Sequence, residues 1–403
     1  MPSHDVGDVA IVGAGPAGAW AAYTLARCGA RVTIIDPSHP REKPCGGGVT
    51  GRALALAAGA LDVARLPACV IRRARFVDPS GGSAAVRLGP APITGSTDPG
   101  SVSHLVVANR TDFDGLLLAA AREAGAHVLA ARVTDVAVGN GNGAVRLETT
   151  AGSQRAAHVI GADGANSLVR RRLAGPFRRA QLSIATGYFA HGVTSDEIVI
   201  ELLSDPPGYI WSFPRPTHLA IGVCAQADAG IGAATLRAKV LDWMKVGGIA
   251  AGARLEPYSW PIPSLAARDF DTLDVAGRGW SLAGDAAGLV DPITREGIYF
   301  ALLSGQWAAE AAASADAHAS ARYADRVRAD IGAELARAAR FKAGFFRPRF
   351  TRLMIEALRH SAPIREVMAD LVAGCQPYAG LKWRLAKTFE LGLAWRLIRQ
   401  RET

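Results

Sequence analysis

Three glycines near the start of the chain have the spacing of a phosphate-binding loop. Gly13, Gly15 and Gly18 form a GxGxxG pattern directly after the apolar segment 8–12, and an alanine-rich stretch then runs to about Cys28. In a strand-to-helix turn of this kind, the first glycine permits the tight turn and the second lets a pyrophosphate approach the backbone, while the third lets helix and strand pack closely. These residues therefore predict a pyrophosphate held at a helix N-terminus.

An acidic residue follows where ribose recognition requires one. A second apolar segment, 31–35, ends in Asp36, roughly twenty residues beyond the first glycine. In dinucleotide-binding folds a carboxylate at this place accepts hydrogen bonds from ribose hydroxyls. The two predicted strands and the acid together favour dinucleotide binding over a chance occurrence of glycines.

Two further aspartates lie beside a glycine at the end of a short apolar segment. These pairs are Asp163-Gly164 and Gly284-Asp285. A carboxylate at such a junction can accept a hydrogen bond from a sugar-like hydroxyl, and a following helix N-terminus faces electron-rich atoms. For Asp163 a turn or helix cap is an equally good interpretation. For Asp285, which precedes a helix predicted from about Glu296, the setting favours ligand binding.

An aromatic stripe marks the middle of the chain. Tyr209, Trp211 and Phe213 alternate within the segment 206–214. This pattern predicts a strand that ends at Pro214 with the three rings on one face. Alone, such a stripe is more often an ordinary sheet core than a substrate surface.

A thiol and an arginine complete the set of candidate reactive groups. Cys45 lies in the glycine-rich segment 43–49, where the backbone can approach a ligand and a thiol could relay a proton. A small packed thiol is at least as good an interpretation. Arg110 begins a predicted helix, and its alternative interpretation, a surface charge, is disfavoured by the positive end of the helix dipole.

Composition bounds the class of protein. With 403 residues, 49% of them hydrophobic, the chain can form two interleaved domains. Its five cysteines are scattered without ligand-like spacing, so we expect neither a disulfide framework nor a metal site. Residues 1–5 lead directly into the first strand, which predicts no signal peptide, and no apolar span reaches membrane length. We therefore expect a cytoplasmic protein.

The region from about residue 320 is helical and basic. A final helix is predicted from apolar residues at four-residue spacing, namely Leu381, Leu385, Phe389, Leu393 and Leu397. A basic amphipathic helix can lie on an anionic membrane or pack against the protein, and packing is the commoner outcome. The net charge of +9 favours an acidic partner or surface, but no motif indicates nucleic-acid binding.

The three glycine and aspartate motifs occur in the order typical of the flavoprotein fold of para-hydroxybenzoate hydroxylase, which the chain resembles. The string at 206–214 is similar to the PxxYxWxFP signature of the geranylgeranyl reductase family, and 43–49 is similar to its KPCGxG segment. The resemblance implies FAD as cofactor. The residues implied to hold it are Gly13, Gly15, Gly18, Asp36, Arg110, Asp163, Gly164, Gly284, Asp285, Pro292 and Gly297.

The resemblance also implies an architecture of mixed class, α/β and α+β. It combines a Rossmann-like FAD-binding domain, an interleaved β-sheet substrate domain and a helical C-terminal region. The expected ranges are 1–60, 104–175 and 270–320 for the FAD domain, 61–103 and 176–268 for the substrate domain, and 321–403 for the helical region.

The activity implied is reduction of carbon-carbon double bonds in an isoprenoid or related hydrophobic substrate. Reduced flavin delivers a hydride to one alkene carbon, and an acid or water must protonate the other. Tyr209, Trp211 and Phe213 are implied to line the substrate cavity. Because the chain has no second GxGxxG, the electron donor must dock transiently, as NAD(P)H or as a reduced carrier protein.

One residue departs from the family pattern. Arg295 stands where the family usually has glycine before Glu-Gly-Ile, and a long cation beside the flavin would favour a substrate with a polar or anionic group. We therefore include Arg295 among the expected substrate-binding residues.

Two other functions remain open at this stage. On the same fold, reduced flavin could react with oxygen in a monooxygenase or halogenase, although the tryptophan-x-tryptophan-x-isoleucine-proline string of halogenases is absent. A flavin-binding protein without turnover, recruited through its basic C-terminal helices, is the third possibility. Intact cofactor motifs beside an aromatic cavity favour an enzyme.

Overall fold

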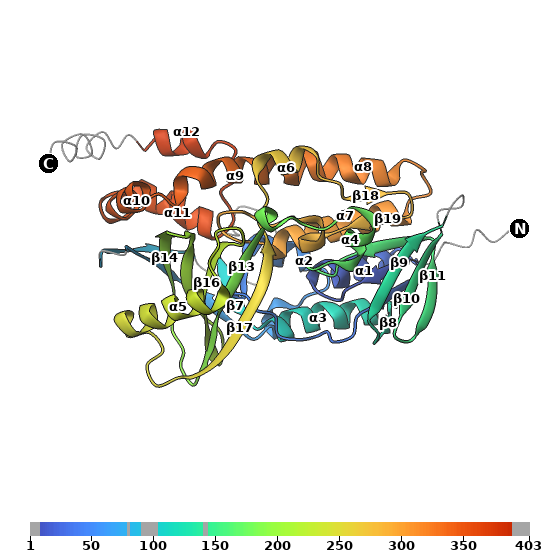
Figure 1. Ribbon diagram of the computed structural model, residues 1–403, viewed down its shortest axis with the longest axis horizontal. Helices are drawn as coiled ribbons and strands as arrows, with labels where there is room; N and C mark the ends of the chain where they lie inside the picture. The colour runs from blue at the N-terminus through green and yellow to red at the C-terminus, as the bar shows by residue number, and fades with distance from the viewer. Residues whose placement is uncertain (1–8, 79–80, 90–103, 140–143, 389–403) are drawn as a thin grey trace, which may run out of the picture.

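The structure is a computed structural model that describes residues 9–78, 81–89, 104–139 and 144–388. Figure 1 shows an elongated molecule with a mostly parallel sheet toward one end and a larger mixed sheet toward the other. The C-terminal helices lie along one long side of the molecule and span both ends.

The parallel sheet forms because several short segments are apolar throughout, as strands covered on both faces must be. β1 (Val9–Val12) lies in its centre, and all four of its residues are buried. The strand order is β18-β19-β12-β1-β2-β8, in which only β18 is antiparallel to its neighbour. The remaining bounds are β2 (Val32–Ile35), β8 (His127–Leu129), β12 (His158–Gly161), β18 (Ala276–Gly277) and β19 (Trp280–Leu282).

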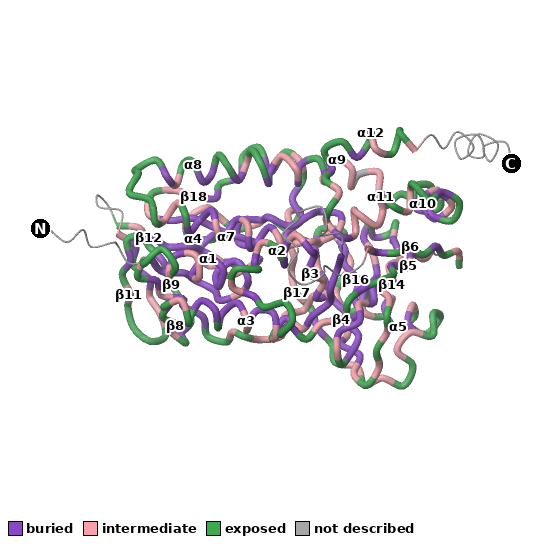
Figure 2. The backbone as a smooth tube through the Cα atoms, turned by 180° about the vertical axis from the view of Figure 1, so that it is seen from behind, coloured by how far each residue is buried: buried purple, intermediate pink, exposed green. Residues whose placement is uncertain are grey.

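Helices cover this sheet. α1 (Pro16–Arg27) packs against α3 (Arg110–Glu123) and α7 (Ile298–Ala313). A 3-10 turn at Gly284–Ala287 follows β19. The shorter helices of this part are α2 (Gly51–Ala57), α4 (Leu168–Leu173) and α6 (Ala267–Asp271). Figure 2 shows that α1 and α7 belong to the buried interior, whereas α8 presents much of its surface to solvent.

Two small antiparallel sheets lie beside the parallel sheet. One contains β9 (Val133–Val138), β10 (Val145–Thr149) and β11 (Gly152–Ala156). The other has the order β3-β7-β4, with bounds β3 (Gly48–Thr50), β7 (Leu105–Ala108) and β4 (Ala68–Ile71).

The mixed sheet has the strand order β17-β13-β16-β15-β14-β5-β6. Its bounds are β5 (Arg73–Val77), β6 (Ser83–Arg87), β13 (Leu182–His191), β14 (Glu197–Ser204), β15 (Pro207–Pro214), β16 (His218–Gln226) and β17 (Arg254–Pro263). Alternation divides the strand residues between two faces. Ile210 packs with α5 (Ala233–Gly247), whereas Tyr209 and Trp211 belong to a separate cluster on the opposite face. The predicted aromatic face is therefore present.

The C-terminal region is helical as far as the structure describes it. Its helices are α8 (Ala319–Arg326), α9 (Ala333–Phe345), α10 (Pro348–His360), α11 (Ala362–Val372) and α12 (Leu381–Ala386), with a π-helical turn at Val327–Gly332. α10 and α11 pack against β6. α12 ends at Ala386, earlier than the four-residue spacing predicted, and Phe389, Leu393 and Leu397 lie outside the described residues.

The predicted fold class is confirmed, with a Rossmann-like parallel sheet, a second sheet interleaved with it along the chain, and a helical C-terminal region. The bounds proposed for the domains stay a prediction. Within the described ranges, no helix is long and apolar enough to cross a membrane. The same ranges contain no group of three or more His, Cys, Asp or Glu residues that could hold a metal ion.

Candidate active site

One cavity of about 940 Å³ brings together most of the residues singled out in the sequence. Those that line it are Gly13, Gly15, Asp36, Cys45, Arg110, Asp163, Gly164, Tyr209, Trp211, Phe213, Asp285, Arg295 and Gly297. Gly18, Gly284 and Pro292 are buried and are not part of the lining.

The glycine loop has the geometry expected for a pyrophosphate cradle. Gly13 has a φ of 100°, and a Cβ there would lie 2.5 Å from the Ala162 carbonyl oxygen. A Cβ on Gly18 would lie 1.9 Å from the Gly13 carbonyl oxygen, so only glycine allows this helix and strand to pack. At Gly15 the nearest atom would be His39 Nε2 at 3.7 Å, and no side chain of the described residues caps the N-terminus of α1. The cradle therefore has room for a ligand.

Asp36 lies at the same end of the cavity and is tightly held. Its carboxylate accepts hydrogen bonds from the backbone N–H groups of Ala14 at 2.9 Å and Ser38 at 2.8 Å. It also contacts His39 Nδ1 at 2.8 Å. Burial raises the pKa of Asp36, but His39 and the backbone donors outweigh this effect and hold it well below its ordinary value. Asp36 is therefore ionised, and its ribose role stays a prediction.

Asp163 acts as a helix cap and also lines the cavity. It accepts from the Ser167 hydroxyl at 2.5 Å and from the backbone N–H of Leu168 at 2.6 Å, at the start of α4. Burial raises its pKa despite these donors. The two interpretations of this aspartate are thus compatible, because the capped carboxylate and Gly164 both border the cavity.

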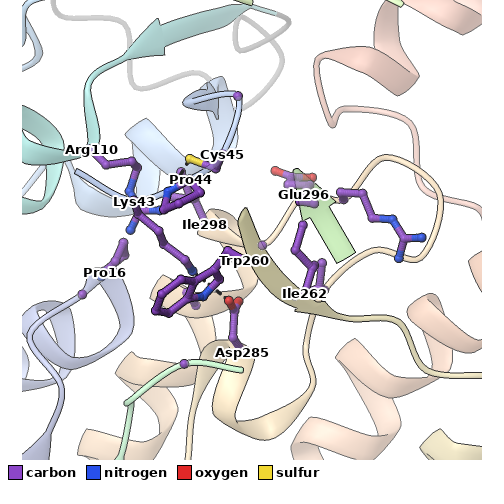
Figure 3. Close-up of a pocket in the computed structure, with 18 of the residues that line it drawn as sticks. Pro16, Lys43, Pro44, Cys45, Arg110, Trp260, Ile262, Asp285, Glu296 and Ile298 are labelled. Carbon is purple, nitrogen blue, oxygen red and sulfur yellow. Dashed lines mark hydrogen bonds and ion pairs between the residues drawn. The ribbon is translucent and has the colours of Figure 1, made fainter. Parts of the chain in front are cut away.

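Asp285 forms an ion pair across the cavity with Lys43, at 2.8 Å. Figure 3 shows Lys43 extending toward Asp285 beside the ring of Trp260. A Cβ on Gly297 would lie 3.3 Å from Asp285 Oδ1, so the glycine leaves space around this carboxylate. This ion pair connects the 43–49 segment to the turn that follows β19.

Two guanidinium groups surround the Cys45 thiol. Arg110 Nη1 and Arg215 Nη2 each lie 3.8 Å from Cys45 Sγ. Arg110 is only 4% exposed and holds Asp114 through two hydrogen bonds of 2.8 and 2.7 Å, so its interpretation as a surface charge is wrong. Arg215 is fully buried and forms an ion pair with Glu42. The thiol therefore lies beside two guanidinium groups, each of which is also paired with a carboxylate.

The glycines next to Cys45 let its segment contact the aromatic face. A Cβ on Gly46 would lie 2.7 Å from the Phe213 ring. Gly47 has a φ of 85°, and a Cβ there would lie 2.4 Å from the Ala108 carbonyl oxygen. Glycine at both positions is thus required for this segment to pack closely against Phe213 and the backbone of β7.

The aromatic face forms one wall of the cavity. The rings of Tyr209 and Trp211 lie 5.5 Å apart, and Tyr209 donates a hydrogen bond to the Thr294 carbonyl at 3.0 Å. Opposite Trp211, a Cβ on Gly222 would lie 2.6 Å from its ring, so glycine makes room for the indole.

Beyond this wall the cavity continues into an apolar arm between the mixed sheet and the C-terminal helices. We call the following residues the apolar arm: Phe76, Leu105, Ile198, Ile200, Leu202, Phe345, Met368, Leu371 and Val372. Such a lining suits a long hydrocarbon chain, which offers no polar groups for recognition.

The loop that precedes α7 presents two charged residues to the cavity. Glu296 accepts from the Thr50 hydroxyl at 2.6 Å and forms an ion pair with Arg52. Arg295 has a φ of 61°, and none of its three guanidinium nitrogens has a hydrogen-bond partner within the described part of the chain. Its side-chain nitrogens are nevertheless buried.

Sequence reasoning missed several charged residues around the cavity. Glu42, Arg52, Arg215 and Lys342 were not identified, although Arg215 directly follows the aromatic string and Glu42 directly precedes Lys43. For Lys342, on α9, the sequence contains no signal, because its neighbours come from distant segments.

Comparisons with known proteins agree with this geometry. The FAD binding domain family matches residues 7–230. Menaquinone reductase of Mycolicibacterium smegmatis is 33% identical over 333 residues, covering 75% of this chain and 75% of that protein. Geranylgeranyl diphosphate reductase of Rhodobacter capsulatus is 31% identical over 321 residues, covering 76% of this chain and 74% of that protein.

The chain belongs to the geranylgeranyl reductase family of FAD-dependent oxidoreductases. A solved structure of a geranylgeranyl bacteriochlorophyll reductase-like protein from Thermoplasma acidophilum has a TM-score of 0.76 at 22% identity, covering 95% of this chain and 99% of that one. A flavin-dependent brominase has a TM-score of 0.67 at 21% identity. At these identities the likeness concerns the fold alone.

The residues of this family member fit FAD. A Cβ on Gly15 would fill the cradle at the uncapped N-terminus of α1, which is where a pyrophosphate binds. Asp36 and Asp285 border the same cavity as this cradle. We assign the pyrophosphate to the glycine loop and the sugar-like chain to Asp285, in line with the sequence prediction, and both assignments stay predictions.

Proposed function

We propose that this enzyme reduces carbon-carbon double bonds in the hydrocarbon chain of a hydrophobic, isoprenoid-type substrate. The observation that carries the proposal is the continuity of the cavity, which is lined by the glycine cradle at one end and by the apolar arm at the other. A chain lying in the arm would bring its double bonds to the aromatic wall and Cys45. Positioning of this kind must supply much of the rate, because an unactivated alkene has little charge to bind.

Bound FAD, once reduced, supplies a hydride to one alkene carbon. The protein must supply the rest, namely a dry and correctly shaped chamber and a proton for the second carbon. We propose Cys45 as the proton donor, since its thiol lies between two guanidinium groups and its segment contacts Phe213. Arg110 and Arg215 would act as positioning residues that fix the sulfur, each through a contact of 3.8 Å.

The electron donor and the place of action are also proposals. NAD(P)H or a reduced carrier protein would reduce the cofactor by transient docking. The basic helices α10 and α12 would allow contact with an anionic membrane surface, because Arg349, Arg352 and Lys382 are exposed on them.

Product analysis without oxygen tests the proposal. The FAD-loaded enzyme would be reduced with dithionite under nitrogen and given geranylgeranyl diphosphate, geranylgeraniol or a menaquinone. We expect a product that has gained two hydrogens for each double bond reduced. A product that forms only after oxygen is admitted, and that contains oxygen, would instead identify a monooxygenase.

A further inference from the structure

Arg295 carries a buried charge that the described residues leave without a hydrogen-bond partner. Its Nε, Nη1 and Nη2 atoms are all buried, and none has a hydrogen-bond partner among the residues that the structure describes. A guanidinium stays protonated in proteins, so Arg295 keeps its positive charge when it is buried. Burial of an uncompensated charge is strongly unfavourable, and buried charges are accordingly paired in proteins. The Arg295 guanidinium therefore needs an anion that the described residues do not supply.

The carboxylates closest in sequence are already engaged. Asp291 accepts hydrogen bonds from the backbone N–H groups of Ile293 at 2.7 Å and Thr294 at 2.9 Å, and from the Tyr378 hydroxyl at 3.2 Å. Glu296 holds Thr50 and Arg52. Neither carboxylate bonds to the Arg295 guanidinium, so the missing partner does not come from these two residues, nor from any other residue that the structure describes.

The backbone conformation at Arg295 favours a functional role for its side chain. Its φ of 61° lies in the left-handed region, which glycine adopts without strain and a long side chain does not. The turn is fixed by a hydrogen bond of 3.0 Å from the Arg295 N–H to the Asp291 carbonyl, which any residue could make. Backbone strain of this kind concentrates at ligand-binding sites.

A second cation lies near this guanidinium. Lys342, on α9, donates to Gln226 Oε1 at 2.7 Å and to Ser264 Oγ at 2.9 Å, which leaves one of its protons for another acceptor. Burial and, next, the charge of Arg295 lower the pKa of Lys342 to about 7. Arg295, Tyr209 and Cys224 line the cavity, and Lys342 lies behind this lining with its charge felt by Arg295 and Cys224.

We propose that Arg295, supported by Lys342, binds an oxyanion of the substrate, a carboxylate or a phosphate, inside the cavity. This inference rests on the proposed function and narrows the substrate class to a hydrophobic chain that carries an anionic group. The planar guanidinium can hold such a group through two parallel hydrogen bonds. The apolar arm, to which Phe345 on α9 contributes, would take the chain.

Ligand binding to the oxidised holoenzyme tests the proposal without turnover. The probes are geranylgeranyl diphosphate, geranylgeranoic acid and neutral geranylgeraniol, and binding is followed through the absorbance of bound FAD. The main variant is Arg295→Gly, which suits the left-handed backbone. Arg295→Met, which removes the charge but keeps an apolar stem, is the second variant. Arg340→Met, an exposed residue of the same helix as Lys342, is the matched control.

We expect both Arg295 variants to bind the anionic probes about tenfold or more weakly than wild type does. Their affinity for geranylgeraniol should stay within about twofold of the wild-type value. Arg340→Met should change neither. If only one of the two anionic probes binds, that probe identifies the oxyanion and the proposal stands. The proposal would be overturned if the variants lost affinity for charged and neutral probes equally, or lost affinity for none of them. Loss of bound FAD from the variants would also overturn it, because the cofactor would then be the partner of Arg295.

The two proposals fail in different ways. An enzyme that binds the anionic probes through Arg295 but reduces none of them contradicts the proposed function and supports the anion site. An enzyme that reduces neutral and anionic chains equally well, with the Arg295→Gly variant unchanged, supports the reductase and contradicts the anion site.

Discussion

Gly15 and Gly18 are three residues apart in the same loop, but their surroundings predict different effects of substitution. At Gly15 the backbone has a φ of −70° that alanine also adopts, and a Cβ would enter only the open cradle. We expect Gly15→Ala to fold normally but to bind FAD about tenfold or more weakly, because the methyl group excludes the pyrophosphate. FAD titration of the apoprotein, with the melting temperature as the check on folding, measures this.

Gly18→Ala is the contrasting variant. A Cβ there would lie 1.9 Å from the Gly13 carbonyl oxygen, which is part of the backbone and cannot move aside cheaply. We expect a loss of about 2 kcal/mol or more in the free energy of unfolding of the apoprotein. If Gly15→Ala bound FAD as tightly as wild type does, the assignment of the pyrophosphate to this loop would be wrong.

Cys45 gives the second prediction. If its thiol protonates the substrate, Cys45→Ala should lower turnover by about a hundredfold while FAD stays bound. Cys69→Ala is the matched control, because Cys69 is a half-buried thiol of β4 outside the cavity lining. Anaerobic turnover at saturating substrate is the measurement. Wild-type turnover in Cys45→Ala would mean that the proton comes from water.

At the residue scale, the sequence predicted the cavity lining best where backbone geometry fixes a residue's place, and the roles of these residues stay predictions. Gly13, Gly15 and Asp36 could be identified because a turn and a strand end fix their positions. The partner sets could not be predicted. Arg110 and Arg215 lie more than sixty residues from Cys45 in the sequence, and only the folded chain brings them to the thiol. That Arg295 has no hydrogen-bond partner among the described residues is likewise visible only in the fold.

The element scale gives a prediction about acid stability. His158, in β12, is buried against Ser281 in β19 at 3.0 Å, and burial lowers its pKa to about 4 from an ordinary value of 6.5. Below pH 6.5 His158 is therefore protonated in the unfolded chain, whereas in the folded protein it stays neutral down to about pH 4. Stability present above pH 6.5 is lost as the pH falls through this window, by about 3 kcal/mol for this group.

Urea unfolding between pH 7 and pH 4 checks this expectation. His158→Asn should flatten the pH dependence of the free energy of unfolding, whereas His127→Asn, at an exposed position of β8 in the same sheet, serves as the control. An equal slope in wild type and His158→Asn would contradict the prediction.

The elements themselves were predictable to different degrees. β1 and β15 could be placed because a short apolar run and an alternating aromatic stripe each have one obvious period. For the final helix, Leu381 and Leu385 of the predicted four-residue spacing lie in α12, and the later positions lie outside the described residues, where the prediction stays untested. The packing of α10 and α11 on β6 was not predictable, because helix periodicity indicates an apolar face but not what covers it.

At the scale of the whole molecule, the apolar arm exists only because the C-terminal helices cover the mixed sheet. Leu371→Trp, on α11, should fill part of the arm and raise the KM for a geranylgeranyl chain several-fold more than for a geranyl chain. Leu385→Trp, at an exposed position of α12, is the control. Steady-state kinetics with the two chain lengths measures the effect. Equal changes in KM for both substrates would mean that the hydrocarbon chain of the substrate does not bind in the apolar arm.

The central claim is that electrons pass from FAD directly to a carbon-carbon double bond. The most direct measurement mixes reduced holoenzyme with an isoprenoid substrate under strict exclusion of oxygen and follows FAD oxidation and double-bond reduction together. We expect FAD to be oxidised only when substrate is present, with one double bond reduced for each FAD oxidised. FAD that stays reduced beside the substrate until oxygen enters would contradict the account.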